Sequence, residues 1–129
     1  MRKLLIASLA LLPLLAVGAD RSHSTPEMWR NAQPQLSIKV EHGAQPDTFD
    51  VIAVVTDHLT GSILSEPRMT IKACSWARAQ LGATGAPGDV SLSLAVTVDP
   101  SGENAAYFAK IHRPDATTDT ESGTMAVSR

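Results

Sequence analysis

Residues 90–98 read Val-Ser-Leu-Ser-Leu-Ala-Val-Thr-Val, the most regular pattern in the chain. Every second residue is a branched apolar one, and the residues between them are Ser, Ala or Thr. A period of two places the apolar side chains on one face of an extended strand and the small ones on the other. The stretch therefore predicts a β-strand with one face buried and the other open to solvent.

Similar patterns on both sides of this stretch indicate further strands. Asp99-Pro100-Ser101-Gly102 has the composition of a hairpin turn closed by a left-handed glycine, and a returning strand follows it at residues 105–112. Residues 49–56 are apolar on both faces, which predicts a central strand covered on both sides. Other strand candidates are residues 36–40, 69–73, 76–81 and 124–127. About seven short strands with almost no helix predict an all-β fold, a small antiparallel two-layer sandwich, with a small open barrel as the alternative.

The N-terminal residues predict export. Arg2 and Lys3 precede a short apolar run, and small residues follow it up to Ala19. This order of charge, apolar run and small residues is typical of a secretory signal peptide. We expect residues 1–19 to be the signal, cleaved after Ala19, and the mature protein to be periplasmic or secreted, with no transmembrane segment after cleavage.

The mature chain divides into two parts. Residues 20–34 are polar and predict either a short helix, capped at Ser24 with Pro26 in its first turn, or a disordered segment. Trp29 is the one aromatic residue there and is expected to pack this segment onto the domain. Residues 35–129 predict a single β domain.

Charge argues against a nucleic-acid partner. The chain has 11 basic and 13 acidic residues. Without Arg2 and Lys3 the mature net charge is 9 − 13 = −4. Such a domain gains little from releasing phosphate counterions, so we expect no nucleic-acid binding.

Cys74 is the only cysteine, so the chain cannot form an internal disulfide. A free cysteine is usually a small buried side chain, and we expect Cys74 to be partly buried. An intermolecular disulfide or a reactive thiol is the alternative.

Chemistry-bearing residues are scattered. The four histidines have no metal-ligand spacing, and no serine lies in a nucleophile elbow. We therefore expect no catalytic residues, no metal and no cofactor. The alternative is a small exported hydrolase or metal-binding protein whose loop-rim residues converge, with His58, His112 and Asp115 as its candidates.

A protein-contact surface is the preferred hypothesis. Its candidate residues are Pro67, Arg68, Trp76 and Arg78, because Pro67 places the start of a strand at a sheet edge and Arg78 beside Trp76 allows that ring to face solvent. Packing of the Trp76 ring in the core is the alternative. The sheet edge near Pro67 and the last strand are expected to accept a partner strand. The sequence thus favours an exported, non-enzymatic β-sandwich protein that contacts an envelope protein.

Residues 64–82 resemble a hairpin of the outer-membrane secretins. The matching residues are Leu64, Ser65, Pro67, Arg68, Thr70, Ala77 and Gly82. Ala79 departs from the branched residue that the family prefers, and Cys74-Ser75 occupies a turn where the family favours Asn or Gly. The resemblance implies a hairpin geometry and an envelope setting, and it makes an accessory component of a secretion system a further alternative.

Overall fold

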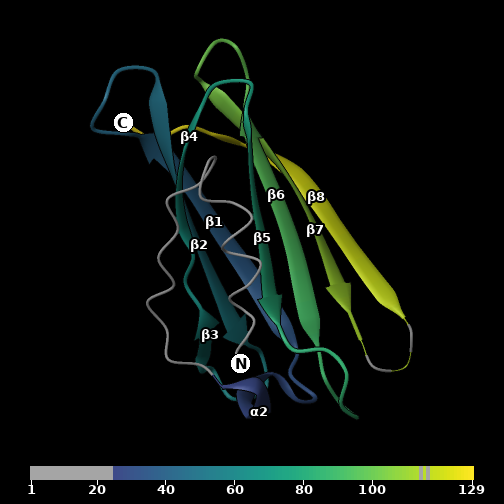
Figure 1. The fold of residues 1–129 in the computed structure, drawn as a ribbon. Coiled ribbons are helices and arrows are strands. Elements are labelled where there is room, and N and C mark those ends of the chain that lie inside the picture. The colour runs from purple at the N-terminus through teal and green to yellow at the C-terminus, as the bar shows by residue number, and fades with distance from the viewer. Residues whose placement is uncertain (1–24, 114, 116) are drawn as a thin grey trace.

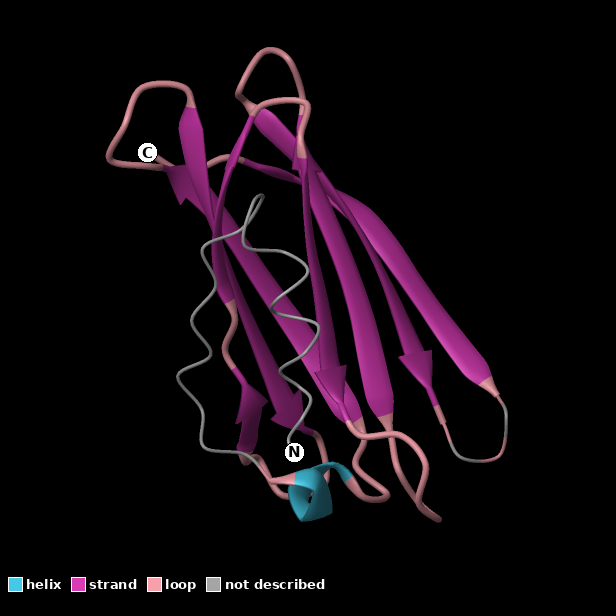
Figure 2. Ribbon diagram, in the orientation of Figure 1, coloured by secondary structure: helices cyan, strands magenta, loops and turns pink. Residues whose placement is uncertain are grey.

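Two antiparallel sheets form the protein in a computed structural model that describes residues 25–113, 115 and 117–129. Sheet A contains β1 (Pro34–His42), β2 (Thr48–Asp57), β3 (Ile63–Ser65) and β4 (Arg68–Lys72). Sheet B contains β5 (Trp76–Gly82), β6 (Ser91–Val98), β7 (Asn104–His112) and β8 (Thr118–Ala126). The sheets form two layers that do not close into a barrel (Figures 1 and 2). This confirms the predicted all-β sandwich.

Neighbouring strands in the sequence pair in sheet B, whereas sheet A has a central strand with partners on both sides. Sheet B is a meander in which β5, β6, β7 and β8 each pair with the next strand. The turn at residues 99–102 joins β6 to β7 as predicted, with Gly102 at φ +75° and its amide donating to the Asp99 carbonyl at 3.0 Å. In sheet A, β2 is central, with β1 on one side and both β3 and β4 on the other.

The core lies between the two sheets. Every apolar residue of the regular stretch at 90–98 that points inward is at most 2% exposed. The inward side chains of β2 and β4 pack from the other layer, among them Val51, Val55 and Ile71. The outward side chains of β2, such as Ile52 and Val54, are only half-buried. The central position predicted for this strand is therefore confirmed, whereas the cover on both faces is not.

Pro67 interrupts the far edge of sheet A. β3 and β4 are two short pieces of one edge, both paired with β2, and the register shifts between Val55 and Thr56. Pro67 lies between the pieces, is buried, and accepts a 3.0 Å hydrogen bond from the Ala53 amide through its carbonyl. The expected edge position of this proline agrees with the structure.

The hairpin implied for residues 64–82 does not form. Both of its strands exist, but β4 pairs with β2 in sheet A and β5 pairs with β6 in sheet B. The intervening turn passes from one layer to the other, and at its centre Cys74 has φ +67° and donates its amide to the Val98 carbonyl at 2.8 Å. Cys74 is exposed, so the expectation of a partly buried side chain is wrong.

A short helix closes one end of the sandwich. α2 (Pro26–Trp29) has Thr25 at its N-cap, without a capping side-chain hydrogen bond, and it lies where β2 and β5 end (Figure 1). Trp29 is 3% exposed and belongs to the core, as predicted. The expected cap Ser24 and the expected signal at residues 1–19 lie outside the described residues.

Asp57, at the end of β2, holds the segment between α2 and β1 against sheet A through hydrogen bonds. Its side chain is 7% exposed and accepts hydrogen bonds from the Gln33 and Leu59 amides, each at 3.1 Å, and from the Thr60 hydroxyl at 3.3 Å. The Gln33 carbonyl accepts in turn from the His58 amide at 2.8 Å. Burial opposes ionisation of Asp57, but the hydrogen bonds outweigh it, and the pKa of this carboxyl lies below its usual value.

This network predicts acid sensitivity. Because the folded pKa of Asp57 is lowered, its contribution is complete above the unfolded pKa of about 4 and is lost as pH falls through the folded value. Replacing Asp57→Asn is expected to cost about 1–3 kcal/mol at pH 7 and less at acidic pH. Urea unfolding of both proteins from pH 7 to pH 3 measures this. A constant difference across that range would contradict the role of the charge.

Candidate functional site

The outer face of sheet B presents aromatic and basic side chains together. Residues paired across neighbouring strands share a face, and the opposite side chains of β5, β6 and β7 lie in the core or against it. The outward positions are Trp76, Arg78, Gln80 and Gly82 on β5, Ser91, Ser93, Ala95 and Thr97 on β6, Asn104, Ala106, Phe108, Lys110 and His112 on β7, and Thr118, Thr120, Ser122, Thr124 and Ala126 on β8. We call this set the outer face of sheet B.

Two large rings stand on this face. Trp76, the first residue of β5, is 41% exposed, and Phe108, within β7, is 43% exposed. The register places Phe108 in one row with Ala95 and Arg78, and it places Trp76 in the next row with Thr97. The residues between the rings are therefore small, so both rings stand above a flat surface.

A cation accompanies each ring. The Arg78 guanidinium carbon lies 5.3 Å from the Trp76 ring centroid, and the Lys110 ammonium lies 5.7 Å from that of Phe108. Both distances are within the range in which a cation is attracted to an aromatic face. The outer face of sheet B includes no Asp or Glu, although the chain has 13 acidic residues. Its formal charge is therefore positive on a molecule whose net charge is −2.

The four predicted contact residues do not share one surface. Trp76 and Arg78 lie together on the outer face of sheet B. Arg68 is exposed, but it pairs with Ile52 and lies on the outer face of sheet A, on the other side of the core. Pro67 is buried and has no exposed side chain for a partner. Phe108 and Lys110 were missed, because only the strand register shows that they share a face with Trp76.

The rim residues of the hydrolase hypothesis form no visible centre. His58, His112 and Asp115 are all exposed, and the Asp115 carboxylate accepts from the amide and hydroxyl of Thr117 at 3.0 and 2.6 Å. The Thr117 hydroxyl is the main cause that lowers the pKa of Asp115. Over the described residues, no group of three or more His, Cys, Asp or Glu side chains is placed to hold a metal ion.

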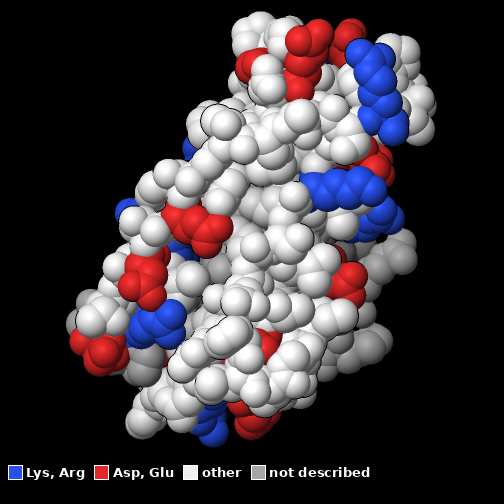
Figure 3. Space-filling model, turned by 180° about the vertical axis from the view of Figure 1, so that it is seen from behind, with Lys and Arg blue, Asp and Glu red and all other residues white. Residues whose placement is uncertain are grey.

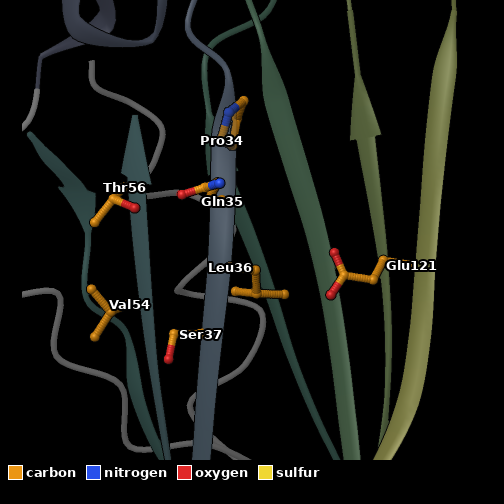
Figure 4. Close-up of a pocket in the computed structure, with 7 residues that line it drawn as sticks. All are labelled: Pro34, Gln35, Leu36, Ser37, Val54, Thr56 and Glu121. Carbon is orange, nitrogen blue, oxygen red and sulfur yellow. The ribbon is translucent and has the colours of Figure 1, made fainter. Parts of the chain in front are cut away.

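A hollow of about 370 Å³ lies along the edge strand β1. It is lined by residues of the outer face of sheet A and, on the core side of β1, by Leu36 and Glu121. Its lining residues are Pro34, Gln35, Leu36 and Ser37 of β1, Val54 and Thr56 of β2, and Glu121 of β8. Leu36 and Glu121 point toward one another across the space between β1 and β8 (Figure 4). The Tyr107 hydroxyl donates a 2.6 Å hydrogen bond to Glu121, and this bond is the main cause that raises the pKa of Tyr107.

The rest of the charge is dispersed. On the side of the molecule seen in Figure 3, acidic and basic side chains are scattered over a largely uncharged surface. No helix in the described part of the chain is both long and apolar enough to cross a membrane.

Comparisons of the chain with protein-family models, with curated proteins and with solved structures find no match.

Proposed function

We propose that this protein is an exported, non-enzymatic binding protein of the bacterial cell envelope that acts through protein–protein contacts, using the outer face of sheet B. The observation that supports this most strongly is the pairing of each exposed ring with a cation on a face that has no carboxylate. Tryptophan and arginine are the residues most enriched among those that dominate binding energy. Aromatic residues are enriched at protein interfaces relative to the rest of the surface.

The charge of the face defines the partner. Arg78 and Lys110 have no carboxylate beside them on the outer face of sheet B, so a partner surface with Asp or Glu gains complementarity there. The rings supply apolar area and the small residues between them admit close approach. We therefore propose a protein partner with an acidic surface that also offers apolar area for the two rings.

Photo-cross-linking in intact cells tests the proposal. A benzoylphenylalanine placed at Phe108 keeps an aromatic ring at the centre of the face, and the same residue at Leu59 is a matched control on a 62% exposed loop position. We expect one discrete cross-linked partner from position 108 and none of that mass from position 59. No adduct at position 108, or the same adduct from both positions, would contradict the proposed surface.

Charge reversal tests the acidic partner. Arg78→Glu and Lys110→Glu together are expected to reduce the cross-linked product from position 108 at least about tenfold, an effect of about 1.4 kcal/mol or more. Thermal unfolding of the double variant should match the parent closely, because both side chains are exposed. An undiminished product at unchanged stability would show that the partner does not read these charges.

Export is tested separately. We expect the protein in the periplasmic or secreted fraction to begin at Asp20, since the predicted signal ends at Ala19. Intact-mass spectrometry of the fractionated protein measures this. A full-length chain confined to the cytoplasm would reject the envelope setting while leaving the contact surface to be tested on its own.

A further inference from the structure

The edge strands β1 and β8 meet at one end only. Ser128 bridges them there: its amide donates to the Val40 carbonyl at 2.8 Å and its carbonyl accepts from the His42 amide at 3.1 Å. Elsewhere in the described chain β1 pairs with β2 and β8 pairs with β7, and no ladder joins β1 to β8. The two strands therefore bound a wedge that is closed near residue 128 and open toward Pro34 and Thr118.

Among the described residues, backbone groups without a partner in a neighbouring strand line both sides of the wedge. Backbone groups of alternate residues point to opposite edges of a strand. The bonds of Val40 and His42 to Ser128 thus place the amides and carbonyls of Leu36 and Ile38 on the open edge of β1. By the same alternation, Thr120, Ser122 and Thr124 present theirs on the open edge of β8, because the Val127 amide turns the other way to bond the Glu103 carbonyl.

The side chains inside the wedge are incompletely covered. Leu36 and Ile38 point to the core side of sheet A but are only half-buried, whereas Val40, at the closed end, is 1% exposed. The hollow of about 370 Å³ along β1 reaches the wedge at Leu36 and Glu121, and the rest of its lining belongs to β1 and β2. An additional strand with apolar inward side chains would bury Leu36 and Ile38 as fully as Val40 is buried.

Glu121 limits which strand can enter. It pairs with Ala109 and lies on the inward side of β8, and an inward-pointing charge on an edge strand normally opposes pairing with another chain. Asp119, on the same side, is already neutralised by Arg113 at 2.9 Å. The described contact of Glu121 is the neutral Tyr107 hydroxyl. The carboxylate of Glu121 is therefore open to pairing with a basic side chain of an incoming strand.

We propose that the wedge between β1 and β8 is a strand-acceptor site for an extended peptide segment that carries a Lys or Arg opposite Glu121 and an apolar residue beside it over Leu36. Backbone hydrogen bonds to the open edges hold the segment, and the basic side chain selects it. Pairing with Glu121 turns the residue that blocks indiscriminate pairing into the specificity determinant. The site is separate from the outer face of sheet B, and either can fail without the other.

Selection from a random ten-residue peptide library displayed on phage tests this site. The library is panned on the whole protein, and synthetic copies of the enriched peptides are titrated against it. We expect the enriched peptides to combine alternating apolar residues with one Lys or Arg. Hydrogen–deuterium exchange should show that they protect the amides of Leu36, Ile38, Ser122 and Thr124.

A charge swap at Glu121 makes the test specific. With Glu121→Lys we expect at least tenfold weaker binding of the enriched peptides and recovery with peptides whose basic residue is replaced by Glu. Tyr107→Phe serves as a control that removes the hydroxyl contact but keeps the charge, and it should change affinity by less than about threefold. An absence of binders, protection elsewhere on the molecule, or equal affinity of both charge forms for Glu121→Lys would each overturn the proposal.

Discussion

Trp29→Ala is expected to destabilise the domain by about 3–5 kcal/mol, the range measured when a buried aromatic residue is truncated in a core. Trp29 is 3% exposed and is the last residue of α2, the helix that lies where β2 and β5 finish. Its segment is tied to both layers, because the Asn31 amide donates to the Gly88 carbonyl at 2.7 Å and the Gln33 amide donates to Asp57. Removal of the indole leaves a cavity that these backbone bonds keep from collapsing.

Trp76→Ala is the matched control for that change. It removes the same side chain, but from a position that is 41% exposed on the outer face of sheet B. We expect it to cost less than about 1 kcal/mol of stability. Equilibrium unfolding in urea measures both variants. Equal losses would contradict the assignment of Trp29 to the core and of Trp76 to the surface.

Gly82→Ala is expected to have the second large effect on stability, about 2–4 kcal/mol. Gly82 ends β5 at φ +97°, which an L side chain rarely adopts. A Cβ atom there would also collide with the Val90 carbonyl oxygen and lie 2.8 Å from the Ser91 Cα and 3.0 Å from the Trp29 ring. Backbone atoms supply the closest contacts, so the clash cannot be relieved by rotating a side chain.

Gly85→Ala distinguishes backbone strain at positive φ from the steric clash of the added Cβ atom. Gly85 also has a positive φ, +106°, but a Cβ atom there would meet nothing within 4 Å. Its substitution therefore reports backbone strain alone, about 1 kcal/mol. We expect Gly82→Ala to exceed Gly85→Ala by at least about 1 kcal/mol in thermal or urea unfolding. Equal effects would mean that the packing of β5 on the end helix is looser than the structure shows.

The strands that alternate strictly could be predicted from the sequence. In β6 every inward residue is apolar, and the turn that follows has the residues its geometry demands, so local chemistry and tertiary packing agree. Trp29 was also predictable, as a lone large ring in a polar segment. β8 was found only in part, because β8 is rich in Thr, Ser and acidic residues and is mostly exposed along an edge.

Pairing between distant strands could not be predicted. The segment at 64–82 has two strands around a short turn, which is also what a hairpin requires, and only the packing of the layers shows that they join different sheets. Half of the candidate contact surface, Trp76 with Arg78, is local in sequence. The other half, Phe108 with Lys110, depends on a register fixed by β6 between them. The wedge at Glu121 depends on the same kind of non-local geometry.

The proposal that the outer face of sheet B is the partner surface can be tested most directly at Trp76 itself. In a Trp29→Phe variant, which keeps a ring in the core, Trp76 is the only tryptophan, and its fluorescence can be quenched by acrylamide with and without the partner identified by cross-linking. We expect quenching to fall at least twofold in the complex, because the indole becomes covered. Unchanged quenching in a saturated complex would show that the partner binds elsewhere and would contradict the proposed function of this face.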